Sequence, residues 1–485
     1  MLGRLRELIR ENVGPIDTDL ALQASMAGLI EAAATRYAVD PGARWTPGEP
    51  LRLLFVGYAG SRNTGADVRV EEMVRQFRHL LGDDLAELSI LTIDPARTRN
   101  YFRTVRQLTL PPVFPKYLFD AVHQQHGVIA CEGSMFKSKF ANALTTLMIG
   151  GLGLAAAENK VAVAYGGEAG RMDPSVEAMV RRYCRDALVI PRNVESEQIL
   201  GRLGVTTRPG TDTAWTYEVD PAIGRATLER LGWDGRAPVL SVCPINPFWW
   251  PVKPDLLKGA GWALAGAFER EHYRSVYFHS SSAEIRRSQD RYLSALAGGV
   301  NAFVERTGAF VVVVGMEMLD RYAAEALEPK LHRRAPLLVS DDHDHDVMVS
   351  VLRNSSYVLS SRYHALVCSM PAGVPSAGVT MDERIPNLMA DRGSPELALR
   401  VDDPELEERV LDVLLRLRDH RDEVAAGIRK CVDANLVRMG QMGMTLVDHL
   451  RELHPDLPID ARFGGHGDPL EHLPGRRLGA ERASA

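Results

Sequence analysis

Short apolar runs alternate with amphipathic helical stretches along most of the chain. The first run, RLLFVG at residues 52–57, is followed by a turn rich in glycine and asparagine and then by the helical pattern VEEMVRQFRHLL. Further apolar runs before residue 192 are ELSILTI, GVIAC, KVAVAYG and ALVIP. Short apolar strands separated by helices are typical of βαβ units around a parallel sheet. This part of the chain therefore predicts a doubly wound α/β domain.

The alternation pauses after Thr211 and Asp212 and then begins again. Its apolar runs are PVLSVCP, RSVYFHS (residues 274–280), AFVVVVG, PLLVSD, YVLSS and PSAGVT, with a helical stretch between each run and the next. Two such blocks predict an α/β fold of two doubly wound parallel-sheet domains that face a cleft. In such sheets, ligands bind outside the carboxyl ends of the strands.

The chain has 485 residues, which is too long for one compact core, and we expect it to divide into five segments. They are a helical extension (1–47), a first α/β domain (48–225), a second α/β domain (226–420), C-terminal helices (421–455) and a disordered tail (456–485). The tail is assigned from its content of glycine, arginine and proline.

Composition narrows the class of protein only a little. Apolar residues make up 45% and charged residues 25% of the chain, and the net charge is −6, so nothing global points to nucleic acid. The longest apolar stretch, residues 143–157, is shorter than the roughly 20 residues of a membrane span and predicts a buried helix. We expect no transmembrane segment, while peripheral membrane contact and the oligomeric state are left open.

The cysteines and the N-terminus indicate a cytoplasmic location. The five cysteines lie far apart without a CxxC pair, which predicts reduced, buried thiols. They are Cys131, Cys184, Cys243, Cys368 and Cys431. The N-terminal sequence MLGRLRELIRENVG is charged throughout and is not a secretory signal.

Three glycine-bearing turns follow three strands of the first predicted domain. They are GYAGSRNTGAD (57–67), CEGSMF (131–136) and YGGEAGR (165–171). Such turns let backbone N–H groups approach an anion, although each alone also fits a tight strand-to-helix turn. Because all three reach the same edge of the sheet, we expect a ligand-lined cleft there. The expected cleft-lining residues are Gly57, Asn63, Gly65, Asp67, Glu132, Gly133, Ser134, Gly166, Gly167 and, at the exit of the domain, Asp212.

A first candidate cation stands at the end of the last strand of this block. Arg192 ends the strand in VIPRNVESEQIL, and its guanidinium is expected to point towards the cleft, available to a carboxylate or phosphate. Pairing with an acid such as Glu195 is the structural alternative.

A second group lies in SSRYHALVCSM, where a strand becomes a helix. Ser360 or Ser361 is expected to cap the helix, and Arg362 and His364 then add donors at a terminus that favours anions. A histidine at a helix start also has structural roles. Arg384 in TMDERIP is expected at the next strand end, close to the same anion.

Two further charged motifs are interpreted as structural. DDHDHD (341–346) contains metal-ligand residue types, but a polar turn leading into a helix is favoured over a metal site. The arginines at 97, 99, 103 and 106 could meet an anionic acceptor, but a solvated face is the default. We therefore expect no metal.

The assembled motifs resemble the polysaccharide pyruvyl transferase family over residues 50–420. The matching pieces occur in the order of the family: GYAGSRNTGAD, CEGSMF, PRNVESEQILGRLGV, TDTAW and SSRYHALVCSMPAGVPSAGVTMDERI. The Arg-x-His-Ala block with Gly-Val-Pro downstream is the most specific of them. The sequence departs from the family at Gly65-Ala66-Asp67, which replaces Gly-Asp-Glu, in the turn CEGSMF, which replaces a run of glycines, and at Arg384, which replaces a lysine.

The resemblance implies a glycosyltransferase-B-like pair of domains and a pyruvyl transferase that uses phosphoenolpyruvate as co-substrate, without a further cofactor. The pyruvyl group passes to a hydroxylated, saccharide-type acceptor and phosphate is released. The resemblance assigns the donor to Arg192, His364 and Arg384. We add Arg362, which we expect to brace the turn, and Ser361 to the donor-binding residues, and we assign His364 as the catalytic acid.

Two other functions stay open from the sequence. A nucleotide-sugar-dependent glycosyltransferase of the same fold would also place its diphosphate at a helix N-terminus. A non-catalytic binding relative would keep the cleft without turnover. The sequence does not identify the acceptor, whose selectivity is expected to lie in loops such as SVCPINPFWWP.

Overall fold

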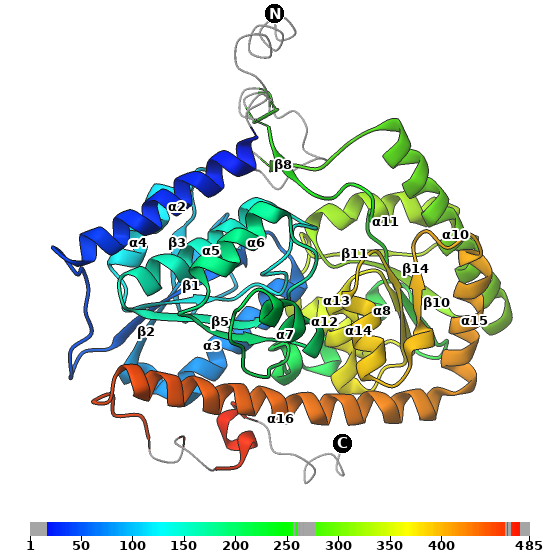
Figure 1. Cartoon of the computed structure of the whole chain (residues 1–485). Coiled ribbons are helices and arrows are strands. Elements are labelled where there is room, and N and C mark those ends of the chain that lie inside the picture. The colour runs from blue at the N-terminus through cyan, green and yellow to red at the C-terminus, as the bar shows by residue number, and fades with distance from the viewer. Residues whose placement is uncertain are drawn as a thin grey trace, which may run out of the picture.

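Two parallel β-sheets with helices on their faces form the molecule (Figure 1). The computed structural model describes residues 17–255, 258–259, 261, 265, 277–460, 463 and 467–475. Each sheet has six strands, in the orders β3-β2-β1-β4-β5-β6 and β11-β10-β7-β12-β13-β14. Both orders reverse direction beside their first strand, which is the doubly wound arrangement. The predicted pair of doubly wound domains is therefore confirmed.

The strands of the first sheet are β1 (Leu51–Ala59), β2 (Ala86–Thr92), β3 (Arg106–Thr109), β4 (Gly127–Ala130), β5 (Val161–Gly167) and β6 (Leu188–Pro191). The central strands β4 and β5 are buried throughout and β1 nearly so, which explains their largely apolar sequences, whereas the edge strand β3 is partly exposed. Along β1, Leu53 and Phe55 enter one core and Leu54 and Val56 enter the core on the other face.

Helices of the first domain cover both faces of this sheet (Figure 1). They are α3 (Thr64–Leu85), α4 (Pro115–His123), α5 (Asn142–Ala157), α6 (Pro174–Tyr183) and α7 (Val194–Arg202). Helix α5 contains the long apolar stretch and is buried, as predicted. Among the described residues, no helix combines the length and apolarity of a membrane span.

The second sheet repeats this plan. Its strands are β7 (Val239–Cys243), β10 (Phe310–Gly315), β11 (Leu337–Val339), β12 (Tyr357–Ser360), β13 (Ser376–Thr380) and β14 (Ala398–Arg400). Its helices are α8 (Pro221–Arg230), α10 (Ala283–Thr307), α11 (Arg321–Leu327), α12 (His345–Asn354), α13 (Tyr363–Ser369), α14 (Arg384–Asp391) and α15 (Leu406–Asp419).

One predicted strand of the second sheet is wrong. Within residues 274–280, β9 (Tyr277–Phe278) pairs antiparallel with β8 (Lys253–Pro254), outside the six-stranded sheet. The two neighbours of β7 in the sheet are β10 and β12, and their ladders satisfy both edges of that strand. The short edge strand β14 completes the sheet instead.

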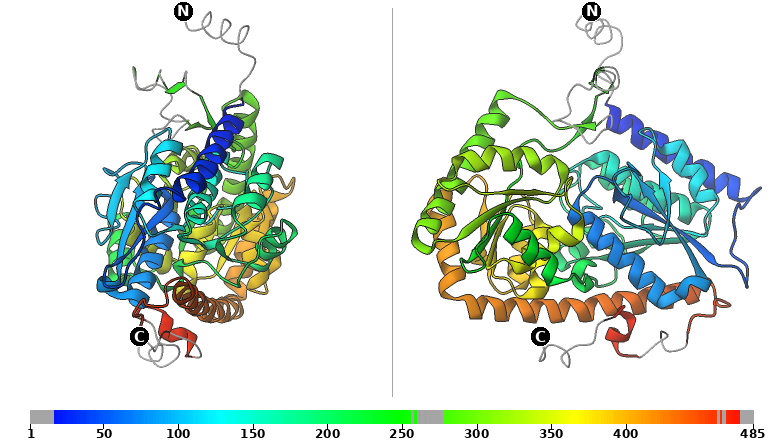
Figure 2. Two further views of the ribbon diagram at one scale, coloured as in Figure 1. Left: turned by 60° about the vertical axis from the view of Figure 1, so that its left-hand side comes forward. Right: turned by 180° about the vertical axis from the view of Figure 1, so that it is seen from behind.

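A single long helix at the C-terminal end joins the two domains. Helix α16 (Arg421–Leu453) lies beneath both sheets in Figure 1 and in both views of Figure 2. Its first half buries Ile428 and Leu436 in the core of the second domain, and its second half buries Leu446 and Leu450 in that of the first.

The two ends of the chain add smaller elements. Helix α2 (Thr18–Tyr37) packs on α5, where the absent side chain of Gly150 admits Met26; the predicted helix before residue 17 lies outside the described residues. Part of the tail that we expected to be disordered is ordered: residues Pro469–His472 form a short 3₁₀ helix that packs on α16 and buries His472. All five cysteines are buried and unpaired, as predicted.

Candidate functional site

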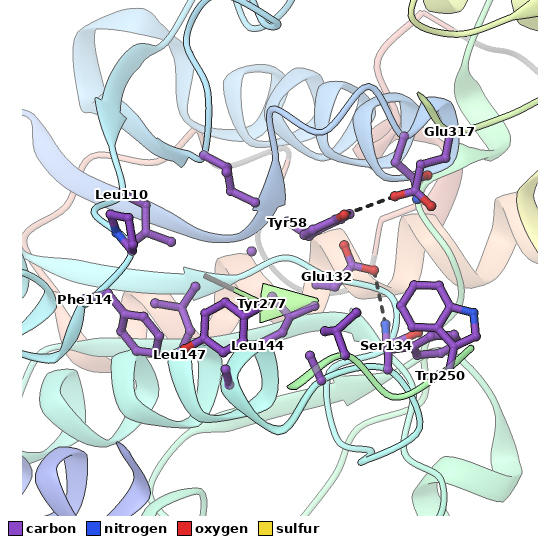
Figure 3. Close-up of a pocket in the computed structure, with 18 of the residues that line it drawn as sticks. Tyr58, Leu110, Phe114, Glu132, Ser134, Leu144, Leu147, Trp250, Tyr277 and Glu317 are labelled. Atoms are coloured by element: carbon purple, nitrogen blue, oxygen red, sulfur yellow. Dashed lines mark hydrogen bonds between the residues drawn. The ribbon is translucent and has the colours of Figure 1, made fainter. Parts of the chain in front are cut away.

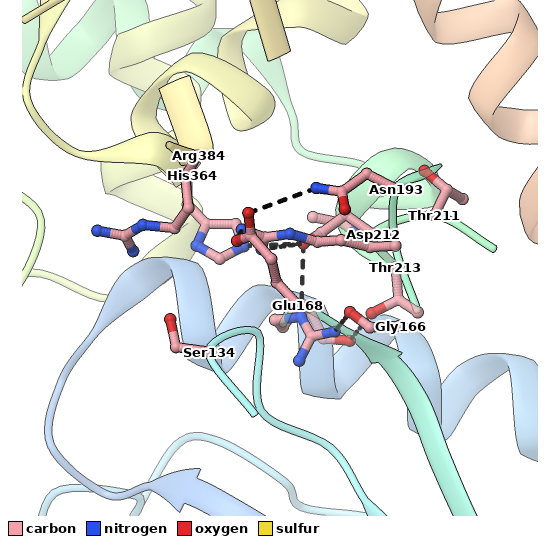
Figure 4. Close-up of polar contacts among 12 residues, drawn as sticks. Ser134, Gly166, Glu168, Asn193, Thr211, Asp212, Thr213, His364 and Arg384 are labelled. Atoms are coloured by element: carbon pink, nitrogen blue, oxygen red, sulfur yellow. Dashed lines mark hydrogen bonds and ion pairs between the residues drawn. The ribbon is translucent and has the colours of Figure 1, made fainter. Parts of the chain in front are cut away.

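The carboxyl ends of β1, β4, β5 and β6 lie at one edge of the first sheet, facing the second domain. Figure 4 shows polar side chains that follow β4, β5 and β6, among them Ser134, Glu168 and Asp212, near His364 and Arg384 of the second domain. Each strand end is followed by one of the motifs singled out in the sequence. The edge of the second sheet contributes the N-termini of α13 and α14. The predicted convergence of strand ends from both domains is therefore present in the structure.

Asp212 is the centre of this arrangement. Its Oδ2 lies 3.2 Å from His364 Nε2, 3.3 Å from an Arg192 Nη and 3.6 Å from Arg69 Nε, and its Oδ1 accepts a hydrogen bond from Ala214 N. The side chains of Asp212 and Arg69 are fully buried. One carboxylate thus holds a histidine from the second domain and two arginines from the first.

Arg192 is closed in by acids, which corrects the expectation of an available guanidinium. It forms ion pairs with Glu168 and Asp212, and its guanidinium lies over the ring of Tyr363 at 4.2 Å. It does not pair with Glu195. The position after β6 predicts that the side chain points into the cleft, but not that the cleft supplies two buried acids.

Glu168 extends the network to the second domain. Its carboxylate lies 3.4 Å from Lys137 Nζ, which is itself 2.8 Å from Glu383 Oε1 at the start of α14. Lys137 is fully buried, so it needs both acids to offset the loss of hydration. Acids and bases therefore alternate across the domain interface.

The charges of this network set the protonation of its central pair. Burial alone would raise the pKa of Asp212, but His364, Arg69 and Arg192 hold it well below its ordinary value. Burial lowers the pKa of His364, and Arg192 adds to this while Asp212 opposes it. A neutral imidazole held by an ionised carboxylate is a group that can exchange one proton with a ligand.

The turn before α13 differs from its predicted form. Arg362, not a serine, is the N-cap residue, and Ser360 Oγ accepts a hydrogen bond from Arg362 N. Ser361 Oγ lies 2.7 Å from the hydroxyl of Tyr292 in the core of the second domain. Both buried serine hydroxyls are therefore hydrogen-bonded inside the protein. The hydroxyl of Ser360 bonds within the turn and that of Ser361 bonds to Tyr292 of α10.

Arg362 braces the turn through two acids. Its guanidinium contacts Asp320 at 2.5 and 2.8 Å and Glu317 at 2.5 Å. Burial raises the pKa of Asp320 to about 6, although Arg362 opposes this. The predicted bracing role of Arg362 agrees with these contacts, and its side chain also reaches the cavity between the domains.

Arg384 begins α14 at the expected strand end. Its Nε lies 2.8 Å from Asp382 Oδ2, and its guanidinium lies 4.5 Å from the centre of the Phe140 ring. Burial would raise the pKa of Asp382, but Arg384 and Lys137 lower it to about 2. Arg384 is therefore charge-balanced and oriented while part of its surface faces the cleft.

The first turn of α3 approaches His364 closely. Asn63 caps the helix by accepting a hydrogen bond from Ala66 N at 3.1 Å, and Thr64 N donates to Met316 O across the interface at 2.9 Å. A Cβ on Gly65 would lie 2.3 Å from His364 Cβ. The glycine at this position is therefore required by the contact between the domains.

Replacing Gly65 with alanine should destabilise the closed interface. Overpacking of this kind costs about 1–3 kcal/mol, since His364 or the helix must move. Urea unfolding should show a lower midpoint for Gly65→Ala. Gly201→Ala in α7 is the matched control, because its Cβ would meet nothing within 4 Å. Equal midpoints for the two variants would contradict the tight contact.

A small pocket of about 40 Å³ lies among these groups. Its lining residues are Asn63, Gly65, Ala66, Glu132, Gly133, Ser134, Arg192, Met316, Arg362, Tyr363, His364 and Arg384. A larger cavity of about 310 Å³ adjoins the small pocket, and the predicted cleft residue Gly57 lines this larger cavity. Gly166 and Gly167 instead offer carbonyl groups, to Arg69 at 2.7 Å and to Arg192 N at 2.8 Å.

Asp67 occupies a different position from the other predicted cleft residues. Asp67 lies in the first turn of α3, where its carboxyl group is buried and neither oxygen has a hydrogen-bond partner among the described residues. Burial raises the pKa of Asp67 well above its ordinary value. The acid that remains in Gly65-Ala66-Asp67 is therefore shifted towards its protonated form by burial, and it does not line the small pocket.

The two motifs interpreted as structural have structural partners. Asp344 in DDHDHD lies 3.1 Å from Arg62 across the domain interface, and His345 stacks on Tyr101 at 4.2 Å. Within the described ranges, no three histidine, cysteine or acidic side chains are placed to hold a metal ion. Of the four arginines, Arg97 turns to Asp94 at 3.2 Å and the others are exposed.

Sequence reasoning missed several members of the network. Arg69, Lys137, Glu168 and Glu317 were not assigned, although Glu168 and Lys137 lie in or beside quoted turns. Arg69 carried a usable signal in the sequence, because it lies between Val68 and Val70 and shares its helix face with the apolar residues Ala66 and Met73. A charged residue at such a position needs a buried partner.

Solved structures of other proteins share this fold at low sequence identity. S. aureus MnaA, solved with UDP, superposes with a TM-score of 0.52 and 8% identity over 83% of this chain and 97% of its own. HepE from Anabaena, in complex with UDP-glucose, gives 0.50 and 12% over 82% and 100%, and a glycosyltransferase from Rickettsia africae gives 0.50 and 8% over 83% and 98%. These likenesses show a glycosyltransferase-B-like fold. No family model matches the chain, and no curated protein matches it.

Proposed function

We propose that the protein transfers the pyruvyl group of phosphoenolpyruvate to a hydroxylated, saccharide-type acceptor and releases phosphate. The observation that carries this proposal is the convergence of Arg362, Arg384 and His364 on one small pocket, which the acid-paired Arg192 also lines. Phosphoenolpyruvate carries about three negative charges on a three-carbon frame, and charge-assisted bonds from arginine orient carboxylate and phosphate groups. The pocket therefore suits a compact anion.

His364 supplies the proton that the reaction needs. Its Nε2 faces Asp212, so its Nδ1, which lies beside Gly65, is the nitrogen placed for the donor. Donor binding first adds a proton at His364 Nδ1. An acceptor hydroxyl then attacks C2 of phosphoenolpyruvate while His364 gives this proton to the C3 methylene, and the proton of the attacking hydroxyl returns to His364. A second hydroxyl then displaces phosphate to give a ketal. In net terms, the two hydroxyl protons end on the new methyl group and on the released phosphate, so the reaction balances.

Nucleotide-sugar-dependent glycosyl transfer is the second candidate, and the fold favours it. The structural neighbours MnaA and HepE were solved with UDP and with UDP-glucose, respectively. A diphosphate would use the same arginines, and a glycosyl transferase would use Glu132 or the Asp212–His364 pair as its base. The two candidates differ in the donor that the cleft binds.

Calorimetric titration of phosphoenolpyruvate, UDP and UDP-glucose distinguishes the candidates. Phosphoenolpyruvate should bind, and Arg384→Ala should weaken it about tenfold or more, because a charge-assisted contact is lost. Arg400→Ala is the matched control, since Arg400 is exposed and paired with Asp402. Binding of UDP or UDP-glucose without binding of phosphoenolpyruvate would replace the first candidate with the second.

A further inference from the structure

The larger cavity has one apolar end. It lies at the carboxyl edge of the first sheet, between α5, the start of α4 and residues 250–252 (Figure 3). Leu110, Phe114, Leu144 and Leu147 gather at this end, on the side away from Glu317. Its volume of about 310 Å³ falls within the range of small-molecule sites, roughly 300–1,000 Å³.

The other end of the cavity is polar and continuous with the small pocket. Both spaces are lined by Asn63, Glu132, Ser134, Arg362 and Arg384. A ligand in the cavity would therefore lie against the groups proposed to hold the donor.

Glu132 marks the junction as a place for a hydroxyl group. Its Oε1 accepts a hydrogen bond from Ser134 N at 3.3 Å, whereas its buried Oε2 has no hydrogen-bond partner among the described residues. The residue is 8% exposed. A buried acceptor without a partner is costly, so a ligand that donates a hydrogen bond there is favoured.

We propose that the cavity binds the hydrocarbon chain of an amphiphilic acceptor, whose hydroxylated head lies at Glu132. This deepens the proposed function, because it names the acceptor class of the same site and rests on donor binding beside it. The change from charged to apolar lining within one cavity carries the inference. A free saccharide would place hydroxyl groups against Leu144 and Leu147, where burial of unpaired polar groups is unfavourable.

If the cavity binds a hydrocarbon chain, the affinity of an amphiphilic ligand should increase with the length of that chain. Each buried methylene contributes a roughly fourfold gain until the space is full. The probes are n-octyl β-D-glucopyranoside, below its micelle concentration, and methyl β-D-glucopyranoside. Both are titrated calorimetrically into the full-length protein without any donor. The octyl compound should bind at least tenfold more tightly than the methyl compound, which presents the same head.

Variants at Leu144 test the position of the chain. This side chain is partly exposed on α5 and lines the cavity, so Leu144→Asp should weaken the octyl probe about tenfold or more. Leu144→Trp fills the space without adding charge and should do the same if the aspartate variant fails to fold. Val113→Asp is the matched control, because Val113 is 72% exposed beside the same loop and does not line the cavity.

Three outcomes would overturn the proposal. They are equal affinity for the octyl and methyl probes, octyl binding that survives both Leu144 variants, and competition between UDP and the octyl probe, which would assign the cavity to a nucleoside. Because no donor is present, the result is independent of phosphoenolpyruvate. Chain-dependent binding without binding of phosphoenolpyruvate would reject the proposed function but keep the apolar acceptor site.

Discussion

Replacing His364 with alanine is expected to lower turnover by about 10²–10⁴-fold, the usual loss when a positioned acid is removed. The fold should survive, because Asp212 keeps Arg69 and Arg192 as partners. The free energy of unfolding should change by about 1 kcal/mol, in line with the loss of one side-chain hydrogen bond. Phosphate release is measured with the acceptor that gives the wild type its highest rate, and unfolding is followed in urea.

His364→Gln separates binding from chemistry. Glutamine keeps a hydrogen-bond donor but cannot transfer a proton, so donor binding should be retained better than turnover. A full rate for His364→Gln, together with an unfolded alanine variant, would make His364 a packing residue.

The pH dependence of donor binding tests the same group. Burial holds the pKa of free His364 low, and a bound anion raises it, so binding takes up a proton. Affinity of the wild type should therefore rise as the pH falls from about 8 to about 6. The glutamine variant should show only the titration of phosphoenolpyruvate itself, and the difference between the two proteins isolates His364.

Replacing Asp212 with alanine should destabilise the protein by about 3–5 kcal/mol, the cost of leaving buried charges without their partner. Arg69 and Arg192 are both buried and would lose a shared carboxylate. The contribution of Asp212 should be present throughout neutral pH, because its pKa is lowered by folding. That contribution is lost only as the pH falls below about 4, where the unfolded carboxyl takes up a proton.

Urea unfolding of two variants checks this prediction. Asp212→Asn keeps the shape and the bond to Ala214 N but removes the charge, so it should lose nearly as much stability as alanine. Asp186→Ala is the control, because Asp186 is exposed and should change stability by about 0.5 kcal/mol or less. A wild-type midpoint for Asp212→Ala would show that the network contributes little to folding.

The fold could be predicted where strands are buried on both faces. Runs such as RLLFVG and AFVVVVG are apolar throughout because both faces of a central parallel strand meet helices. The edge strands β3 (RQLT) and β14 (ALR) escaped prediction because they are short and carry few apolar residues. The run RSVYFHS resembled a central strand, but its position in the sheet is decided by partners distant in sequence.

The site was predictable in its location and less so in its bonding. Strand ends and helix starts place Arg192, His364 and Arg384 together, and this follows from topology alone. Topology does not predict which acid pairs with each cation, because Asp212 and Glu168 come from separate turns whose geometry depends on the whole domain. The use of Ser361 by Tyr292 likewise depends on the packing of α10.

Helix α16 also affects the order in which the chain can mature during synthesis. The apolar core of the first domain that contains Leu446 and Leu450 stays without them until about 260 residues after β6 have been made. At about 5–20 residues per second, this is a delay of roughly 13–50 s. During that time the nascent first domain presents an apolar strip to its surroundings, which is the kind of surface that chaperones bind. Nearly the whole chain must therefore be synthesised before the core of either domain is complete.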